Sequence, residues 1–321
     1  MIIHLAHFEL SGEKRWGIVK DDKLYLIEEK YPTTASLLDN KLSLFILANN
    51  GLEALQHVAF DRVKLLSPVI GNQRVICQGA NYRQHMIESG FDPDAKSYNM
   101  FFNKSSASIC ASGSSIIKPS HVSLLDYEVE LGLVIGNAIH QHTEISQAKL
   151  SDYIAGIVIC NDVSARDVQI PETQFFKGKS YRSFCPVGPY LCLLDQESMH
   201  YLDKLELKLS VNGEVRQHDN TKNLVFKPAE TLSELSSFSD LDVGDLVLTG
   251  TPSGCALRIP SGSIVKLFSL LPEKTRWKLF KRIQGKRSQY LKQGDLIEAQ
   301  IWSADKKVNL GIQSNQVSDQ S

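Results

Sequence analysis

The residues most able to do chemistry are carboxylates spaced two apart in one short stretch. Asp126, Glu128 and Glu130 alternate with other residues at the start of segment 126–136. Side chains on a β-strand alternate between its two faces, so these three would project together. Carboxylates this close repel one another, and a divalent cation would remove that cost. Hard oxygen ligands favour Mg²⁺, Mn²⁺ or Ca²⁺, whereas the alternative interpretation is an edge strand with a charged, solvated face.

A further carboxylate and a lysine follow along the chain. Asp162 stands after the apolar run 157–160, where a strand would give way to a polar turn. It is a candidate third ligand, or else a helix cap that accepts hydrogen bonds from free N–H groups. Lys179 lies beside Gly178 in an aromatic setting. It is either a surface charge or a group that stabilises a substrate anion or a developing oxyanion.

Two other segments offer a base and a polar turn. On a helix, His85 and Glu88 would be three residues apart, so that the carboxylate would orient the imidazole and raise its basicity. The pattern H-x-x-E also occurs on ordinary surface helices. The glycine-rich stretch 244–254 contains Thr251. Its backbone N–H groups and the threonine hydroxyl would suit a carboxylate, although purely structural turns have the same composition.

Short strands must position most of these groups. Beyond residue 70, short helices are predicted at 81–89, 146–150 and 228–238, and Asn212-Gly213 predicts a hairpin turn. We therefore expect a mixed, β-dominated α+β fold. The strands are indicated by short β-branched or alternating runs between turn residues, at 75–77, 128–135, 153–161, 190–194, 205–212, 246–249 and 296–301.

The first 70 residues have a different pattern. Residues 1–28 predict a small antiparallel meander, and residues 33–60 predict two short amphipathic helices. Ser67-Pro68 closes this unit, because the residue before proline is pushed out of the helical region. We expect a small N-terminal α+β domain over residues 1–70 and a larger domain over residues 71–321.

Composition limits the class of protein. The 321 residues include 35 basic and 36 acidic side chains, a net charge of −1, which disfavours a general nucleic-acid binder. No segment approaches the roughly 18 to 20 apolar residues of a membrane span, and the start lacks the pattern of a signal peptide. The six cysteines lie far apart without a C-x-x-C pair. They indicate reduced thiols and a cytoplasmic location.

One segment departs from this charge balance. Residues 266–292 contain nine Lys or Arg against one acid, Glu273. Trp277, Phe280 and Ile283 recur at a spacing of three, which predicts a basic amphipathic helix. The simpler interpretation is a solvated insertion whose apolar stripe packs on its own domain. A role at a membrane surface or on nucleic acid has no other support in the sequence.

Taken together, these motifs resemble the fumarylacetoacetate hydrolase family. The matching segments occur in the family's order over about residues 75–255. The resemblance implies a β-sandwich roll for the larger, catalytic domain, a divalent metal that is usually Mg²⁺, and often a homodimer. Two features depart from the shorter family members: the basic insertion at about 261–292, and Asn103-Lys104 in place of the more usual Leu-Lys.

The resemblance also implies roles for particular side chains. Three would ligate the metal: Glu128, Glu130 and Asp162. Three would carry the chemistry: His85 with Glu88 as a water-activating pair, and Lys179 beside the substrate. Four match substrate contacts of the family: Tyr82, Arg166, Gln169 and Thr251.

The implied reaction is hydrolysis of a C–C bond in an acylpyruvate or fumarylpyruvate-type diketo acid. The 2-oxo carboxylate would chelate the metal, and His85, held by Glu88, would deprotonate the attacking water. The metal and Lys179 would stabilise the pyruvate enolate. The alternative enzyme is an isomerase or decarboxylase of a 2-oxo acid in aromatic catabolism, of the 2-hydroxyhepta-2,4-diene-1,7-dioate isomerase type. From a different class, the alternative is a non-catalytic binding or scaffold homologue.

Overall fold

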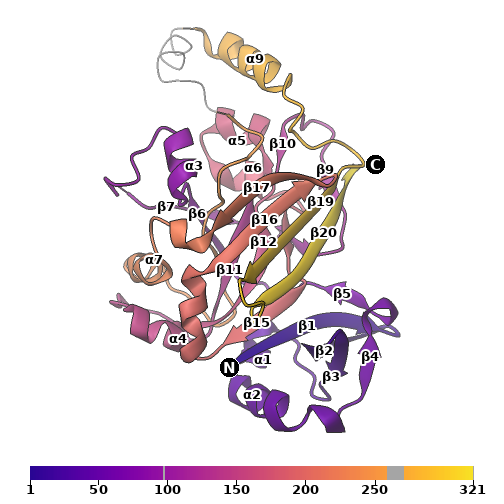
Figure 1. Cartoon of the computed structure of the whole chain (residues 1–321). Helices are drawn as coiled ribbons and strands as arrows, with labels where there is room; N and C mark the ends of the chain where they lie inside the picture. The colour runs from indigo at the N-terminus through magenta and orange to yellow at the C-terminus, as the bar shows by residue number, and fades with distance from the viewer. Residues whose placement is uncertain (97, 259–270, 321) are drawn as a thin grey trace.

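Two β-sheets, packed face to face, form the centre of the molecule (Figure 1). The computed structural model describes residues 1–96, 98–258 and 271–320. The expected β-dominated α+β fold is confirmed, and each of the seven strands predicted beyond residue 70 overlaps an observed strand. The hairpin at Asn212-Gly213 is also present, with φ angles of 52° and 81° between two paired strands.

The larger sheet has 13 strands. Its main path runs in the spatial order β4 (His57–Ala59), β3 (Lys23–Leu26), β2 (Glu13–Lys20), β1 (Ile2–Leu10), β15 (Tyr190–Leu194), β12 (Ile154–Asn161), β11 (Val129–Ile135), β18 (Leu246–Leu248), β6 (Val75–Gly79) and β7 (Met100–Lys104). Three short strands join this path from the side: β5 (Lys64–Leu66), β8 (Ile109–Ala111) and β14 (Cys185–Val187). The strands of the N-terminal unit and of the larger domain therefore share one sheet.

The second sheet covers the centre of the first. Its strands lie in the order β17 (Glu214–Asn220), β16 (Leu205–Val211), β19 (Leu296–Ser303), β20 (Asn309–Asp319) and β9 (Ile116–Lys118). Strands β16 and β19 pack against β11 and β12, and the core between the sheets includes Leu131, Ile157, Leu207 and Ile301. A separate pair joins β10 (Leu125–Asp126) to β13 (Ser164–Ala165).

Short helices surround the sheets. The α-helices are α1 (Thr34–Leu38), α2 (Lys41–Asn50), α3 (Arg83–Glu88), α4 (Leu150–Tyr153), α5 (Arg166–Glu172), α6 (Phe175–Lys179), α7 (Pro228–Leu235) and α9 (Glu273–Gln284). Short 3₁₀ segments lie at Leu52–Ala54, Phe60–Arg62, Ser106–Ser108, Gln147–Lys149, Glu197–Asp203 and Thr221–Asn223. No helix in the described ranges is long and apolar enough to span a membrane.

The N-terminal unit differs from the sequence prediction at one point. The meander is present, and the first predicted helix appears as two, α1 and α2. The second predicted helix, over Leu52, Leu55 and Val58, is absent: a 3₁₀ turn and strand β4 take its place. Strand β4 pairs with β3 in an antiparallel register, and this tertiary pairing overrides the local spacing. The unit is also bonded to the larger domain, because β1 pairs with β15 from Ile2 opposite Leu194 to Ala6 opposite Tyr190. The boundary near residue 70 stays a prediction.

The basic amphipathic helix is present as α9, at the opposite end of the molecule from α1 and α2 (Figure 1). Phe280 packs against the main core, whereas the Ile283 side chain is 41% exposed. Residues 261–270 of the predicted insertion lie outside the described residues. The apolar stripe of the helix is therefore only partly covered by its own domain.

Candidate metal centre and substrate cavity

Two neighbouring strands bring three carboxylates together. Glu130 lies in β11 opposite Cys160 of β12, and Asp162 follows the end of β12. The Asp162 backbone N–H donates to the Glu128 carbonyl at 2.8 Å, and the Glu128 N–H donates to the Asn161 side chain at 2.9 Å. One ligand oxygen from each of the three carboxylates then lies within 4.8 Å of the others. An ion with metal–oxygen distances of about 2.1–2.5 Å spans opposite ligands at such separations.

Buried cations pair with two of these carboxylates. The Lys179 ammonium lies 2.8 Å from Glu128 Oε2 and 2.5 Å from Asp162 Oδ2, and Lys104 Nζ lies 2.5 Å from Asp162 Oδ1. Arg166 pairs with Glu128 and with Asp126. Burial by itself would raise the pKa of Glu128, but Arg166 and Lys179 outweigh burial and hold this pKa at about 2. Glu128 is therefore a carboxylate at neutral pH.

Glu130 is the exception within the cluster. Its side chain is buried and accepts a hydrogen bond from the Gly250 N–H at 2.7 Å, but it forms no ion pair among the described residues. Burial raises the pKa of Glu130 well above its usual value, and the charges of Asp162 and Glu128 raise it further. An ionised Glu130 therefore lacks a compensating charge, and a divalent cation at these oxygens would provide one. The donor set fits a hard divalent ion.

A cavity of about 440 Å³ opens onto this cluster. Eight of the ten side chains predicted from the sequence line it: His85, Glu88, Glu128, Glu130, Arg166, Gln169, Lys179 and Thr251. Asp162 is completely buried and lies behind the lining, where it pairs with Lys179 and Lys104. Apolar and aromatic side chains form much of the remaining wall, including Phe91, Met100, Phe102, Ile170 and Phe175.

Tyr82 is the residue that the structure separates from the cavity. It precedes α3 in an extended conformation and forms a β-bridge with Leu224, which turns its ring into the core. The ring is completely buried, and its hydroxyl has no hydrogen-bond partner among the described residues. Tyr82 therefore does not line this cavity, and its substrate contact stays a prediction.

Helix α3 places His85 and Glu88 at the cavity, but not as a hydrogen-bonded pair. Glu88 instead accepts a hydrogen bond from Gln84 Nε2 at 3.2 Å, and no hydrogen bond joins Glu88 to His85 in the described ranges. Burial lowers the pKa of His85, and the Glu128 carboxylate opposes part of this shift. The imidazole is thus neutral near pH 7 and is able to accept a proton.

Sequence comparison places this site in a known family. A family model described as the C-terminal domain of fumarylacetoacetate (FAA) hydrolase matches residues 74–318. The chain belongs to the fumarylacetoacetate hydrolase family. The matched region contains every residue of the carboxylate cluster, both helices α3 and α6, and the insertion with α9.

Relatives in the fumarylacetoacetate hydrolase family carry different activities in their names. An oxaloacetate tautomerase of Bacillus subtilis is 38% identical over 198 residues, which are 61% of this chain and 64% of that protein. A 2,4-didehydro-3-deoxy-L-rhamnonate hydrolase of a Sphingomonas strain is 33% identical over 255 residues, covering 78% of this chain and 75% of that one. The solved fumarylacetoacetate hydrolase of Exiguobacterium antarcticum superposes with a TM-score of 0.74 at 26% identity, over 99% of this chain and 100% of that chain.

Sequence reasoning named Lys104 and Asp126 but missed the buried partners of both charges. Lys104 ends β7 and binds Asp162, and Asp126 binds Arg166 as well as the backbone N–H groups of Ala256 and Leu257. Both contacts join positions far apart in the sequence. The only local signal is that each charge stands at the end of a largely apolar stretch, a position where a charged side chain is seldom buried without a partner.

Thr251 has a largely structural contact in this turn. Its hydroxyl donates to the Val129 carbonyl at 3.0 Å and accepts from Gln217 Nε2 at 2.9 Å. The turn is thereby bonded to the start of β11, next to Glu130. Thr251 lines the cavity, but its hydroxyl hydrogen serves the backbone, so its contribution to ligand binding would come through the oxygen lone pairs and the methyl group.

Gly254 is expected to be irreplaceable in this turn. It has a φ of +108°, and an added Cβ would lie 2.0 Å from the Arg216 carbonyl oxygen. Gly254→Ala should lower the free energy of unfolding by roughly 2–5 kcal/mol, from backbone strain and overpacking combined. Denaturant unfolding with Gly294→Ala as the control isolates the contact, because Gly294 also has a positive φ but nothing within 4 Å of the added Cβ. If both variants lost the same free energy of unfolding, the close approach of Gly254 to the Arg216 carbonyl would not be the cause.

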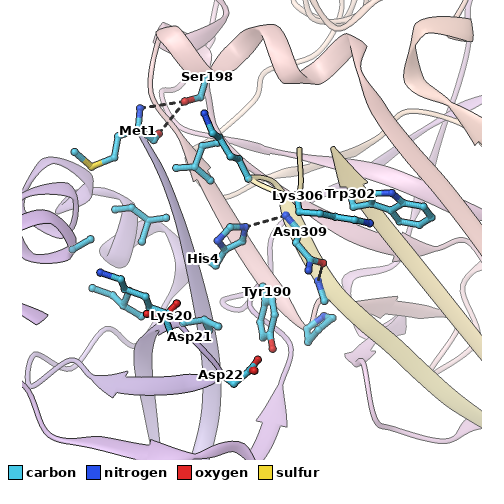
Figure 2. A pocket seen from close by; sticks show the side chains of 18 of the residues that line it. Met1, His4, Lys20, Asp21, Asp22, Tyr190, Ser198, Trp302, Lys306 and Asn309 are labelled. Carbon is cyan, nitrogen blue, oxygen red and sulfur yellow. Dashed lines mark hydrogen bonds between the residues drawn. The ribbon is translucent and has the colours of Figure 1, made fainter. Parts of the chain in front are cut away.

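A second, larger cavity lies away from this site. Its volume is about 1320 Å³. It lies between the N-terminal strands and the C-terminal hairpin, and His4, Tyr190 and Trp302 are among its lining residues (Figure 2). None of the ten predicted site residues lines it. Its charges are of both signs, including Lys20 and Asp21. The smaller cavity, which holds the carboxylate cluster and the base, is therefore the candidate active site.

Proposed function

We propose that this chain catalyses keto–enol tautomerisation of a 2-oxo acid of the oxaloacetate type. The observation that carries this proposal is a neutral base, His85, that shares a cavity with the carboxylate cluster and Lys179 but is not hydrogen-bonded to Glu88. Proton transfer at carbon requires one base and a group that supports an enolate, whereas hydrolysis also requires an oriented water. The name of the Bacillus relative supports the same choice.

The side chains of the cavity account for the proton transfer. In the direction from keto to enol, His85 takes a proton from the carbon next to the 2-oxo group, and that C–H electron pair becomes the new C=C bond. The Lys179 ammonium supports the negative charge that develops on the 2-oxo oxygen. A divalent ion held by Glu128, Glu130 and Asp162 would supply Lewis-acid stabilisation of the same charge. The protonated imidazole then returns its proton to that oxygen, which completes the exchange.

Arg166 and Gln169 are suited to orient a substrate. Arg166 Nη1 donates to Gln169 Oε1 at 2.8 Å, so the amide oxygen is already bound and the Gln169 NH₂ group is left to donate. Both residues line the cavity. An NH₂ group presented in this way would bind a carboxylate or oxo oxygen and favour one orientation of the substrate.

The test is decay of the enol absorbance of oxaloacetate. We expect acceleration by the protein with Mg²⁺ and loss of that acceleration with a chelator. Acetylpyruvate and fumarylpyruvate serve in parallel as hydrolase substrates, with pyruvate as the measured product. Metal-dependent pyruvate release with no effect on the oxaloacetate enol would overturn the tautomerase proposal in favour of hydrolysis.

Hydrolysis of an acylpyruvate or fumarylpyruvate-type diketo acid is the second candidate. Glu88 lines the same cavity and lies one helical turn from His85, so a change of its side-chain rotamer would form the water-activating pair. The name of the Sphingomonas relative, a hydrolase, supports this candidate. An isomerase or decarboxylase of a 2-oxo acid would use the same enolate chemistry.

The activity should depend on pH through His85. Because burial lowers the pKa of this imidazole below its ordinary value of 6.5, its basic form already predominates at neutral pH. The logarithm of kcat/KM is therefore expected to rise with pH along an acid limb centred below 6.5 and then to reach a plateau. Steady-state kinetics across the acid range measure this limb. If the acid limb of kcat/KM were centred above about pH 7, the pKa of the catalytic base would not be lowered by burial, and His85 would not fit that role.

The donor atoms, the family and the cysteines support proposals for the metal, the assembly and the location. We propose Mg²⁺ as the ion, with Mn²⁺ or Ca²⁺ as possible substitutes, because the site offers only oxygen ligands. The homodimer is proposed from the family resemblance. A cytoplasmic location agrees with the six cysteines, all of which are free thiols in the structure.

A further inference from the structure

The basic helix α9 and the residues that follow it are hydrogen-bonded to the wall of the candidate active site. Gln284, the last residue of α9, is 3% exposed and donates from Nε2 to the Arg258 carbonyl oxygen at 2.8 Å. The buried Tyr290 hydroxyl donates to Gln284 Oε1 at 2.9 Å, so the oxygen and the nitrogen of this amide are both hydrogen-bonded. Arg287 Nε donates to the Ala256 carbonyl at 2.8 Å. The insertion therefore holds the outer side of segment 256–258 through buried and half-buried contacts.

The same segment is held from the inside by the charge network of the site. Asp126 accepts hydrogen bonds from the backbone N–H groups of Ala256 and Leu257, at 2.7 and 3.0 Å, and it also accepts from Arg166 Nε at 2.8 Å. Arg166 in turn pairs with Glu128 of the carboxylate cluster. Segment 256–258 thus links the candidate metal centre to α9, and its position depends on both.

This segment places a cationic side chain on the cavity. Arg258 is exposed and lines the cavity with its neighbour Leu257. The two other cations of the lining, Arg166 and Lys179, are deep and are ion-paired with Asp126, Glu128 and Asp162. The planar guanidinium of an arginine matches a carboxylate with two parallel hydrogen bonds. Arg258 is therefore placed to meet the end of a ligand whose other end lies at the carboxylate cluster.

The wall between these two ends is apolar. Phe91, Met100, Phe102 and Leu257 are among the lining residues, and a second carboxylate of a ligand would lose hydration against them without a cationic partner. The cavity volume of about 440 Å³ leaves room for a 2-oxo acid of four carbons or more. The lining thus combines a polar end, an apolar passage and a guanidinium.

We propose that Arg258 binds the second carboxylate of a dicarboxylic 2-oxo acid and selects for that substrate class, and that Gln284 of α9 acts as its positioning residue. This proposal rests on the proposed function, because it places the first carboxylate and the 2-oxo group at the acidic cluster. It also assigns a role to the insertion, which holds a specificity residue at the substrate cavity.

Binding of a matched pair of inert ligands tests Arg258 apart from catalysis. Lactate and malate are 2-hydroxy acids that differ by one carboxylate, and calorimetry with Mg²⁺ present gives Kd for each. We expect the wild type to bind malate at least tenfold more tightly than lactate. Arg258→Gln should raise the Kd for malate roughly tenfold and leave the Kd for lactate unchanged. Arg258→Lys should restore part of the malate affinity, since lysine keeps the positive charge but cannot form the two parallel hydrogen bonds of a guanidinium.

Control variants separate positioning from a general effect of the basic helix. Arg282→Gln removes a charge from the exposed side of α9 and should leave both dissociation constants unchanged. Gln284→Leu combined with Tyr290→Phe removes the tether and its partner together, which avoids an unpaired buried hydroxyl. This double variant should lower malate affinity selectively, whereas Tyr290→Phe by itself keeps the bond to Arg258 and should not.

The outcomes distinguish this proposal from the proposed function. No preference for malate in the wild type, or equal losses for lactate and malate in Arg258→Gln, would overturn the role of Arg258 whatever reaction the protein catalyses. The binding preference together with no effect on the oxaloacetate enol would keep the dicarboxylate site and reject tautomerisation. If the protein is a tautomerase, Arg258→Gln should raise KM for oxaloacetate about tenfold with little change in kcat.

Discussion

Glu130→Gln is expected to abolish metal-dependent activity and at the same time to stabilise the metal-free protein. The carboxylate of Glu130 is 1% exposed, has no ion pair among the described residues, and has a pKa raised well above its usual value by burial and then by Asp162 and Glu128. A glutamine oxygen would still accept from the Gly250 N–H, and its NH₂ group would face carboxylates instead of repelling them. The free energy of unfolding without metal should rise by about 1–3 kcal/mol.

The same substitution removes a charged ligand from the candidate metal centre. Lewis-acid stabilisation contributes several kcal/mol to the transition state, so its loss should lower kcat/KM by about 10³-fold or more. Calorimetric unfolding with Mg²⁺ and with a chelator measures the stability effect. The wild type should gain several degrees of Tm on adding the ion, and Glu130→Gln should gain nothing.

The pH dependence of stability provides a further readout of Glu130. A group whose folded-state pKa is raised contributes stability that is fully present below its unfolded value of 4.5 and is lost as the pH rises through the folded-state pKa. The difference in metal-free stability between variant and wild type should therefore be smallest in acid and grow toward neutral pH. Glu144→Gln is the matched control, because its side chain is 86% exposed and the substitution should change neither quantity. If metal-free Glu130→Gln were less stable than the wild type at neutral pH, the Glu130 carboxylate would not be destabilising the metal-free protein.

His85→Gln should lower kcat by about 10²- to 10⁴-fold while leaving the stabilisation by metal intact. Glutamine keeps a polar side chain on α3 but cannot accept the proton, and His85 pairs with none of the three carboxylate ligands in the described structure. Tautomerisation of oxaloacetate and the Mg²⁺-induced rise in Tm are the two measurements. His121→Gln is the control, because that imidazole bonds to Tyr181 and does not line the cavity. Full activity in His85→Gln would remove this residue from the mechanism.

Glu88→Gln then decides between the two reactions proposed for the site. Because Glu88 accepts a hydrogen bond from Gln84 rather than orienting His85, the substitution should change tautomerisation less than about threefold. A loss as large as that of His85→Gln, accompanied by pyruvate release from an acylpyruvate in the wild type, would show that the two residues act together on water. The hydrolase would then replace the tautomerase.

The spacing of the carboxylates made much of the candidate site predictable from the sequence. On an extended chain, Glu128 and Glu130 must share a face, because side-chain direction repeats every two residues. The apolar run before Asp162 marks the end of a strand for the same local reason, and β12 does end at Asn161. Likewise, the spacing of Trp277, Phe280 and Ile283 locates α9, since helical periodicity depends only on nearby residues.

Tertiary structure alone decided which charges are compensated. Lys104 reaches Asp162 because β7 lies in one sheet with β12, and Asp126 reaches Ala256 because the turn after β18 folds back over β10. The order of strands in a sheet depends on long-range pairing, which local periodicity does not contain. The same reason separates Tyr82 from the cavity and leaves Glu130 with no ion pair in the described part of the chain. The types and spacing of its residues thus determined what chemistry this protein has available. The packing of distant segments determined which carboxylate has no ion pair among the described residues and which arginines line the candidate active site.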